Sequence, residues 1–172
     1  AALTGAGCFV ISFLSHQMVS SGIDLDLRLA EGVPAIKGRA GKLQQIFTNI
    51  LINSLQSMKG GAGRIRVETA VRDNWVSIQI GDTGEGIPPE NLDKIFEPFF
   101  TTKELGQGTG LGLSVTYGLV KDMGGNITVD SVVGERTTFM VAFPAMDMMD
   151  DAAGMPNKNV DSNKETCANA GL

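Results

Sequence analysis

Alternating glycines give one short segment of the chain the composition of a phosphate-binding loop. The segment reads GQGTGLGL and contains Gly106, Gly108, Gly110 and Gly112. Glycine permits positive φ and lets a ligand approach the backbone closely. An apolar-periodic segment follows at once, and the unpaired amides and dipole at the start of a helix favour negative charge. We therefore interpret the segment as a phosphate cradle, with a flexible loop that caps a helix as the alternative.

This loop differs from two familiar phosphate motifs. It lacks the Gly-Lys-Ser/Thr ending of a Walker A loop, and no reading frame gives the dinucleotide fingerprint G-x-G-x-x-G. The identity of the ligand therefore depends on the chemistry of other segments.

Two asparagines lie four residues apart in a segment with helical periodicity. Asn49 and Asn53 therefore share one face of the expected helix, although the residues around Asn53 are apolar. An amide in that position offers a neutral oxygen, and Mg²⁺ prefers hard oxygen ligands, few of them from protein when phosphates supply the rest. A buried asparagine that caps a neighbouring loop is the alternative.

An acidic residue follows directly after an expected strand. The segment from Asp82 to Gly86 reads DTGEG, so its glycines would let the edge of a ligand approach the Asp82 carboxylate. A carboxylate accepts hydrogen bonds, and adenine presents an amine donor where guanine presents an acceptor oxygen. The segment thus favours recognition of adenine, with an ordinary Asp-Thr-Gly turn as the alternative.

A cluster of aromatic residues precedes the glycine loop. The segment from Phe96 to Lys103 reads FEPFFTTK, and residues 101–107 after the aromatics are expected to form a mobile lid. Lys103 is a candidate phosphate partner. For the aromatic side chains we adopt the simpler interpretation, a small hydrophobic cluster under the loop.

Hydrophobic periodicity predicts a mixture of strands and helices. Strict alternation at residues 23–29 is typical of a half-buried strand, and apolar spacings of three and four at 41–58 are typical of an amphipathic helix. The other expected elements are an extended piece at 34–36, strands at 64–71, 75–80, 127–131 and 137–143, and helices at 90–96 and 111–123. With the strands paired as hairpins, one sheet face would pack against the helices, which predicts an α/β fold, a two-layer α/β sandwich.

Composition and charge bound the function classes. The chain has 172 residues, 42% of them hydrophobic, and a net charge of −5, which favours one globular domain and disfavours a nucleic-acid surface. The sequence contains no run of eighteen apolar residues, so no membrane span is predicted. Cys8 and Cys167 lie too far apart in sequence and context for a disulfide framework, so we expect a reducing compartment, the cytoplasm. We predict residues 1–21 as a remnant of an upstream linker or helix, 22–144 as the domain and 145–172 as a disordered tail.

Four motifs occur in a family-like order and spacing. The asparagine pair, then DTGEGI, FEPFFTTK and GTGLGL, resemble the N, G1, F and G2 boxes of the ATP-binding catalytic domain of two-component sensor histidine kinases. The resemblance covers residues 22–144 and implies the Bergerat ATP-binding fold, with a mixed sheet and helices on one face. The FFTTK run looks most like the nitrogen-regulation and metal-sensing subgroup of these kinases.

The resemblance implies Mg²⁺ and ATP as ligands. Asn53 would hold Mg²⁺, Asp82 would meet the adenine amine, and Asn49 and Lys103 would lie at the catalytic end of the nucleotide. The other residues that the resemblance assigns to the nucleotide site are Gly84, Gly86, Ile87, Phe96, Thr101, Thr102, Gly108, Thr109, Gly110, Leu111, Gly112, Leu113 and Thr137. The implied partners are a histidine-containing dimerisation domain of the same parent protein and a downstream response regulator, with the isolated domain monomeric.

Individual residues bear on the rival functions, on the phosphoacceptor and on a departure from the family pattern. Related ATP-hydrolysing enzymes carry a glutamate one helical turn before the metal asparagine, whereas this chain has Asn49, which cannot act as a general base at neutral pH. A nucleotide-gated interaction module is the alternative that is not an enzyme. His16, the only histidine, lacks the acidic residue and later proline of an acceptor motif, so we expect the phosphoacceptor on another domain. Arg136 stands before Thr137 where the family usually has glycine.

Overall fold

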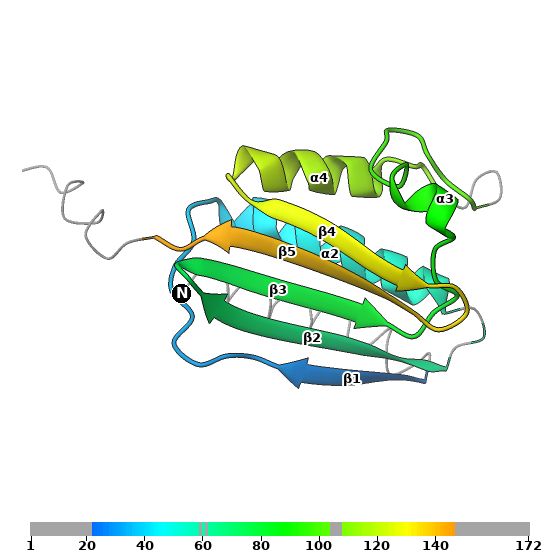
Figure 1. The fold of residues 1–172 in the computed structure, drawn as a ribbon, viewed down its shortest axis with the longest axis horizontal. Coiled ribbons are helices and arrows are strands. Elements are labelled where there is room, and N and C mark those ends of the chain that lie inside the picture. The colour runs from blue at the N-terminus through cyan, green and yellow to red at the C-terminus, as the bar shows by residue number, and fades with distance from the viewer. Residues whose placement is uncertain (1–21, 59, 61, 104–107, 147–172) are drawn as a thin grey trace, which may run out of the picture.

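A five-stranded sheet is the centre of the structure, a computed structural model that describes residues 22–58, 60, 62–103 and 108–146. The strands are β1 (Ile23–Arg28), β2 (Gly63–Arg72), β3 (Trp75–Asp82), β4 (Asn126–Val132) and β5 (Arg136–Pro144), and the helices are α2 (Ala40–Ser57), α3 (Pro89–Leu92) and α4 (Gly112–Asp122). The sheet order is β1-β2-β3-β5-β4. β1 is parallel to β2 and the other neighbours are antiparallel, so the sheet is mixed, as predicted (Figure 1).

The connection between β1 and β2 explains where α2 lies. Parallel neighbours need a crossover, and the chain makes it by forming α2 between the two strands. α2 covers one face of the sheet, and α4 lies beside α2 on the side of β4 (Figure 1). The two-layer α/β sandwich predicted from the sequence is confirmed.

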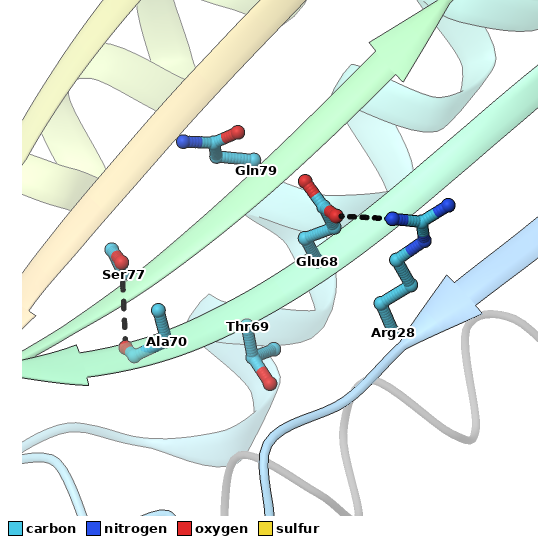
Figure 2. A pocket seen from close by; sticks show the side chains of 6 residues that line it. All are labelled: Arg28, Glu68, Thr69, Ala70, Ser77 and Gln79. Atoms are coloured by element: carbon cyan, nitrogen blue, oxygen red, sulfur yellow. Dashed lines mark hydrogen bonds and ion pairs between the residues drawn. The ribbon is translucent and has the colours of Figure 1, made fainter.

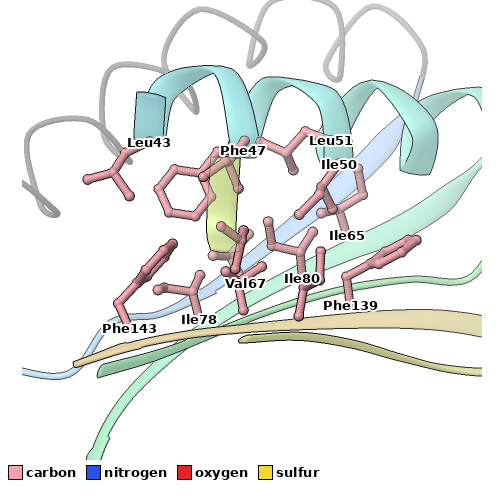
Figure 3. Close-up of a cluster of buried hydrophobic side chains, with 14 of the residues drawn as sticks. Leu43, Phe47, Ile50, Leu51, Ile65, Val67, Ile78, Ile80, Phe139 and Phe143 are labelled. Atoms are coloured by element: carbon pink, nitrogen blue, oxygen red, sulfur yellow. The ribbon is translucent and has the colours of Figure 1, made fainter. Parts of the chain in front are cut away.

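The hydrophobic core fills the space between α2 and the sheet (Figure 3). The buried apolar positions of α2 repeat at spacings of three and four, and they are Leu43, Ile46, Phe47, Ile50 and Leu51. The sheet contributes alternate residues, which include Ile65, Val67, Ile78, Ile80, Phe139 and Phe143. Complete burial of one such side chain stabilises the fold by about 1.5–3 kcal/mol, so this interface fixes α2 on the sheet.

Turn chemistry ends the elements where the sequence predicts. Asp73 and Asn74 connect β2 to β3 with φ of 49° and 63°, the left-handed pair that a tight type I′ hairpin requires. α4 ends at Asp122, and Gly124 closes its end with φ of 69° and an amide that donates to the carbonyl of Lys121 at 2.9 Å.

The short helix differs from its prediction. α3 covers only Pro89–Leu92, whereas residues 90–96 were predicted to be helical. The chain then continues in turns, because the amides of Lys94 and Glu97 each donate to a carbonyl three residues earlier. The buried side chain of Ile95 holds this turn against the core.

The end of the domain extends slightly past Pro144. The amide of Ala145 donates to the Asn74 carbonyl at 2.8 Å, and the amide of Met146 donates to the Ala35 carbonyl at 2.7 Å. These two residues, predicted as part of the tail, are therefore hydrogen-bonded to the domain. The predictions for residues 1–21, including His16, and for residues 147–172 lie outside the described residues.

Opposite charges face each other along the parallel strands β1 and β2. Asp24 is in register with Arg64, Asp26 with Arg66, and Arg28 with Glu68, and their shortest N···O distances are 3.0, 2.8 and 3.6 Å. A one-residue slip of β1 would bring none of these charges opposite its partner. The charges therefore select the register of an edge strand whose apolar residue Leu27 is 44% exposed.

Asp26→Asn should reduce the acid sensitivity of folding. The hydrogen bond from Arg66 lowers the pKa of Asp26 below its ordinary value of 3.8. A carboxyl group whose pKa is lower in the folded state stabilises the fold above its unfolded pKa, and this stabilisation is lost as the pH falls through the folded pKa. The variant should melt slightly lower than wild type at neutral pH, and the difference should shrink below pH 3.8. Asp93→Asn, at an exposed residue, is the control; an unchanged pH profile in Asp26→Asn would show that the ion pairs do not contribute.

Candidate functional site

The carboxyl group of Asp82 is buried at the end of β3. Its side chain is 3% exposed, and Oδ1 accepts hydrogen bonds from the amide of Gly84 and the hydroxyl of Ser57, each at 3.0 Å. No described residue donates a hydrogen bond to Oδ2. One oxygen is thus held by the protein, while the other keeps its acceptor capacity.

Burial raises the pKa of Asp82, and the Gly84 amide, the nearby Ser54 hydroxyl and the hydrogen bond from Ser57 oppose that rise. Desolvation disfavours the charged form of a carboxyl group, whereas donors to its oxygens favour it. A buried carboxylate costs stability, so its presence at the end of the central strand β3 marks a candidate binding residue.

The loop after Asp82 is fixed from two sides. The amide of Glu85 donates to the carbonyl of Ser57 at 3.1 Å, and the carbonyl of Glu85 accepts from the amide of Gly134 at 2.8 Å. Gly86 has φ of 70°, and a Cβ there would lie 2.3 Å from the carbonyl oxygen of Val132. The loop therefore packs against the β4–β5 turn as closely as glycine allows, and it presents a rigid edge to a ligand.

Thr137 and Ile87 join this end of the sheet. Thr137 is directly opposite Asp82 in the β3–β5 register and is 3% exposed. The hydroxyl groups of Ser131 and Thr137 lie 2.9 Å apart, and the Ser131 hydroxyl also accepts from the amide of Ile87 at 2.8 Å. Arg136 starts β5 and pairs with Asp130, so the arginine in place of glycine is accommodated on the β4–β5 hairpin.

Asn53 presents its amide oxygen to a cationic group. The ammonium of Lys103 donates to Oδ1 of Asn53 at 3.3 Å and also to Oε1 of Gln56. The surroundings of this oxygen thus accommodate positive charge, as a ligand of a hard cation such as Mg²⁺ requires. The described residues contain no group of three or more His, Cys, Asp and Glu side chains that could hold a metal, so a cation here would need oxygens from its ligand.

Asn49 connects α2 to the start of α4. Its Nδ2 donates to the carbonyl of Gly112 at 3.0 Å and to Oγ1 of Thr116 at 3.1 Å. The amide nitrogen thus holds the first turn of α4, a contact that no sequence motif indicated. A side chain so held cannot accept a proton from water, which agrees with its neutral chemistry.

The glycine segment packs against the aromatic segment. Gly110 has φ of 65°, and a Cβ there would lie 2.4 Å from the carbonyl carbon of Phe99. The amide of Phe99 donates to the carbonyl of Gly110 at 2.9 Å, and Phe99 itself has φ of 67°. A Cβ on Gly108 would lie 3.1 Å from both Thr101 Oγ1 and Lys103 Cδ. The two segments therefore form one unit at the start of α4.

The other predicted site residues around the glycine segment differ in exposure. Phe96 and Leu113 are half-buried, and the ring of Phe96 lies 5.5 Å from that of Tyr117. The exposed members of the predicted set are Thr101, Thr102, Thr109 and Leu111. The aromatic cluster expected beneath the loop thus includes Tyr117, whereas Phe99 is 74% exposed.

α2 contacts each of the other three motifs. Ser57 bonds to Asp82, Asn53 to Lys103, and Asn49 to Gly112. The sequence motifs included the two asparagines but not Ser54 and Ser57; the available signal was the helical spacing of Ser57, four residues after Asn53 and three after Ser54. A shallow hollow elsewhere is lined by Arg28, Glu68, Thr69, Ala70, Ser77 and Gln79, and it contains none of the predicted site residues (Figure 2).

A family comparison decides the identity of this arrangement. Residues 38–147 match the model of the histidine kinase-, DNA gyrase B- and HSP90-like ATPases. The chain belongs to this family. It is an ATP-binding domain of the histidine kinase type, as the four motifs predicted.

Relatives of this ATP-binding domain are sensor kinases. The sensor kinase CckA of Brucella abortus is 40% identical over 151 residues, which cover 79% of this chain and 16% of that protein. The catalytic domain of the histidine kinase ThkA is 26% identical with a TM-score of 0.75, covering 84% of this chain and 93% of that one. Full-length ShkA, solved in complex with AMPPNP, is 28% identical with a TM-score of 0.72, covering 83% of this chain and 30% of that one. The chain thus spans about a sixth of the length of CckA.

Proposed function

We propose that the domain binds Mg·ATP and transfers the γ-phosphoryl group to a histidine on a separate dimerisation domain of its parent protein. A response regulator would receive the phosphoryl group downstream, and the catalytic step would take place in the cytoplasm. Family membership and the named sensor kinases among its relatives support this proposal. None of the described helices combines the length and the apolar composition that a membrane-spanning helix requires.

The arrangement of Asp82 at the proposed adenine end of the site is the observation that carries the proposal. Asp82 offers Oδ2 to the base amine, because Gly84 and Ser57 hold Oδ1. Gly84 and Gly86 let the base approach the backbone, and Ile87 and Thr137 complete the pocket beside it. A buried acceptor of this kind selects a purine with an amine at C6.

The phosphate end is formed by Asn53, Lys103 and the glycine segment before α4. Asn53 Oδ1 would ligate Mg²⁺, with phosphate oxygens as the other ligands. When bound, Mg²⁺ neutralises phosphate charge. Lys103, which contacts Asn53 in the free domain, would then pair with phosphate oxygens, and the amides that begin α4 would add further donors.

An exposed apolar surface next to the phosphate end fits the acceptor domain. Phe99 is 74% exposed, Leu111 37% and Val115 38%, and the hydrogen bond between Phe99 and Gly110 ties this surface to the glycine segment. A helix bearing the acceptor histidine could cover these side chains and bring its imidazole near the γ-phosphate. A neutral imidazole nitrogen is itself a nucleophile, so the domain needs no base of its own.

Hydrolysis of ATP is disfavoured by Asn49. Its amide nitrogen is engaged with Gly112 and Thr116, and an amide cannot take a proton from water at neutral pH. The isolated domain should therefore bind ATP and hydrolyse it only at a trace rate. Addition of the separately made acceptor domain with γ-labelled ATP should give acid-labile label on that acceptor. Binding without transfer would favour a nucleotide-gated interaction module, and rapid phosphate release would favour an ATPase.

Asn53→Ala should weaken binding of Mg·ATP while leaving adenosine binding nearly unchanged. The lost amide oxygen removes one direct ligand of the metal but no contact to the base. Calorimetry with Mg·ATP, with ATP in EDTA and with adenosine measures the two effects. Gln56→Ala is the matched control, because Gln56 shares the contact with Lys103 but is not a predicted metal ligand. An equal loss for all three ligands in Asn53→Ala would make Asn53 structural.

A further inference from the structure

Two serine side chains of α2, Ser54 and Ser57, lie beside the carboxyl group of Asp82, and the proposed function gives neither of them a role. Ser57 is the last residue of α2, and its hydroxyl is 3.0 Å from Oδ1 of Asp82. Ser54 lies one helical turn earlier, and its hydroxyl is close enough to lower the pKa of Asp82. Two hydroxyls from one helix face thus border a carboxylate that is expected to read the base.

The hydrogen bonds of Oδ1 define how the carboxylate is turned. The amide of Gly84 can only donate, so Oδ1 must be an acceptor. The single proton of the Ser57 hydroxyl has two acceptors, the carbonyl of Ser54 at 2.8 Å and Oδ1 of Asp82 at 3.0 Å. A charged acceptor attracts the proton more strongly than a neutral carbonyl, so Ser57 favours the ionised Asp82. Any proton bound by this carboxyl group would therefore be on Oδ2, the oxygen that faces the ligand.

Ser54 carries a hydroxyl that the fold itself does not use. The residue is 0% exposed, and its Oγ is the one buried side-chain polar atom among the described residues without a hydrogen-bond partner. An unpaired buried hydroxyl destabilises a protein, and alanine in its place would also favour the helix. A side chain that costs stability next to a ligand-facing carboxylate is accounted for by a role in binding.

We propose that Ser54 and Ser57 are positioning residues that determine base specificity, because they keep Oδ2 of Asp82 a pure acceptor directed at the ligand. The site then takes a purine with an amine at C6 and rejects one with an oxygen there. Without the hydroxyls, burial would favour the protonated carboxyl group, whose Oδ2–H donates and suits the 6-oxo purine. This inference rests on the proposed function, in which Asp82 reads the base.

No charge from the neighbouring elements competes with the two hydroxyls. Asp82 pairs across the sheet with Ile65 on β2 and Thr137 on β5, both uncharged. The charged residues that flank these positions and the loop are exposed, and they are Arg64, Arg66, Glu85 and Arg136. Burial and hydrogen bonds are the causes of the shifted pKa of Asp82.

Binding of ATP and of inosine triphosphate tests the inference, because these ligands differ only at C6 and the adjacent N1 of the base. Ser57→Ala should reduce the preference for ATP by about tenfold, since a charge-assisted bond is lost, and the loss should grow as the pH is lowered from neutrality. Ser57→Thr, which keeps the hydroxyl, should restore the preference. Ser54→Ala should reduce the preference while raising the melting temperature. Ser77→Ala, on the open face of the sheet, is the matched control and should change neither quantity.

The outcomes separate this inference from the proposed function. An unchanged ratio of ATP to inosine triphosphate affinity in both Ser54→Ala and Ser57→Ala, with an altered ratio in Asp82→Asn, would overturn the inference alone. An unchanged ratio in Asp82→Asn as well would remove Asp82 from the base pocket and overturn both. A lower melting temperature with an unchanged ratio would make the serines structural.

Discussion

Asp82→Asn should invert the base preference of the domain. The amide of Gly84 and the hydroxyl of Ser57 both donate to the position of Oδ1, so they require the amide oxygen of the new asparagine there. Its NH₂ group then occupies the position of Oδ2. This group is a donor and faces the adenine amine, which is also a donor, so the two cannot form a hydrogen bond. Loss of such a bond costs about 1–3 kcal/mol, which corresponds to roughly a 5- to 150-fold weaker affinity for ATP. Inosine triphosphate, which offers an acceptor at C6, should lose little or gain.

Thermal unfolding of the Asp82→Asn variant provides the control. Since burial raises the pKa of Asp82, the charged group costs stability in the empty domain at neutral pH, and a neutral amide removes that cost. The variant should therefore melt no lower than wild type near pH 7. ATP binding that is unchanged by calorimetry would contradict the placement of Asp82 in the base pocket.

Gly110→Ala should damage the phosphate end of the site more than the adenine end. The position has φ of 65°, and the new Cβ would lie 2.4 Å from the backbone carbonyl carbon of Phe99, which cannot rotate away. The strained backbone conformation alone costs about 1–3 kcal/mol, and relief of the clash must move the glycine segment. We expect ATP affinity to fall by roughly tenfold or more. Adenosine affinity should stay nearly the same, because the base pocket lies on the sheet.

Gly118→Ala is the matched control for Gly110→Ala. Gly118 lies within α4, and among the described residues no atom beyond its own stretch of helix lies within 4 Å of the position that its Cβ would take. Alanine there should stabilise the helix by about 0.5–1 kcal/mol without changing nucleotide binding. If Gly110→Ala weakens ATP and adenosine equally, the segment acts on the whole fold and is not a phosphate cradle.

Local patterns predicted the elements whose causes are local. The apolar spacing of residues 41–58 predicted α2 to within one residue at each end, and Asp73 and Asn74 predicted the β2–β3 hairpin, because helix faces and tight turns depend on neighbouring residues. The length of α3 was predicted wrongly, since residues 93–96 are held as turns by contacts with the core. The parallel pairing of β1 with β2 depends on a crossover and on facing charges, which no single segment contains.

The residues of the candidate site likewise divide into those that local sequence patterns predicted and those whose contacts depend on the folded chain. Asp82, Asn53 and the glycines stood out because their residue types are unusual at those positions. The role of the Asn49 amide could not be read from the sequence, because its partners Gly112 and Thr116 lie more than sixty positions away and meet it only in the folded chain. The contacts of Ser54 and Ser57 with Asp82 likewise arise from the packing of α2 on β3.

The three contacts of α2 are separated by fixed distances along the helix. Asn49, Asn53 and Ser57 lie on successive turns of α2. A helix rises 1.5 Å per residue, so about 12 Å of helix axis separates Asn49, which contacts α4, from Ser57, which contacts Asp82. One helix thus sets the distance between the proposed place for the base and the proposed place for the terminal phosphates. An extra residue between Asn53 and Ser57 would turn one end by about 100° relative to the other, so both ends of a nucleotide could not be bound together. The length of α2 between these contacts would therefore select ligands by their length as well as by their chemistry.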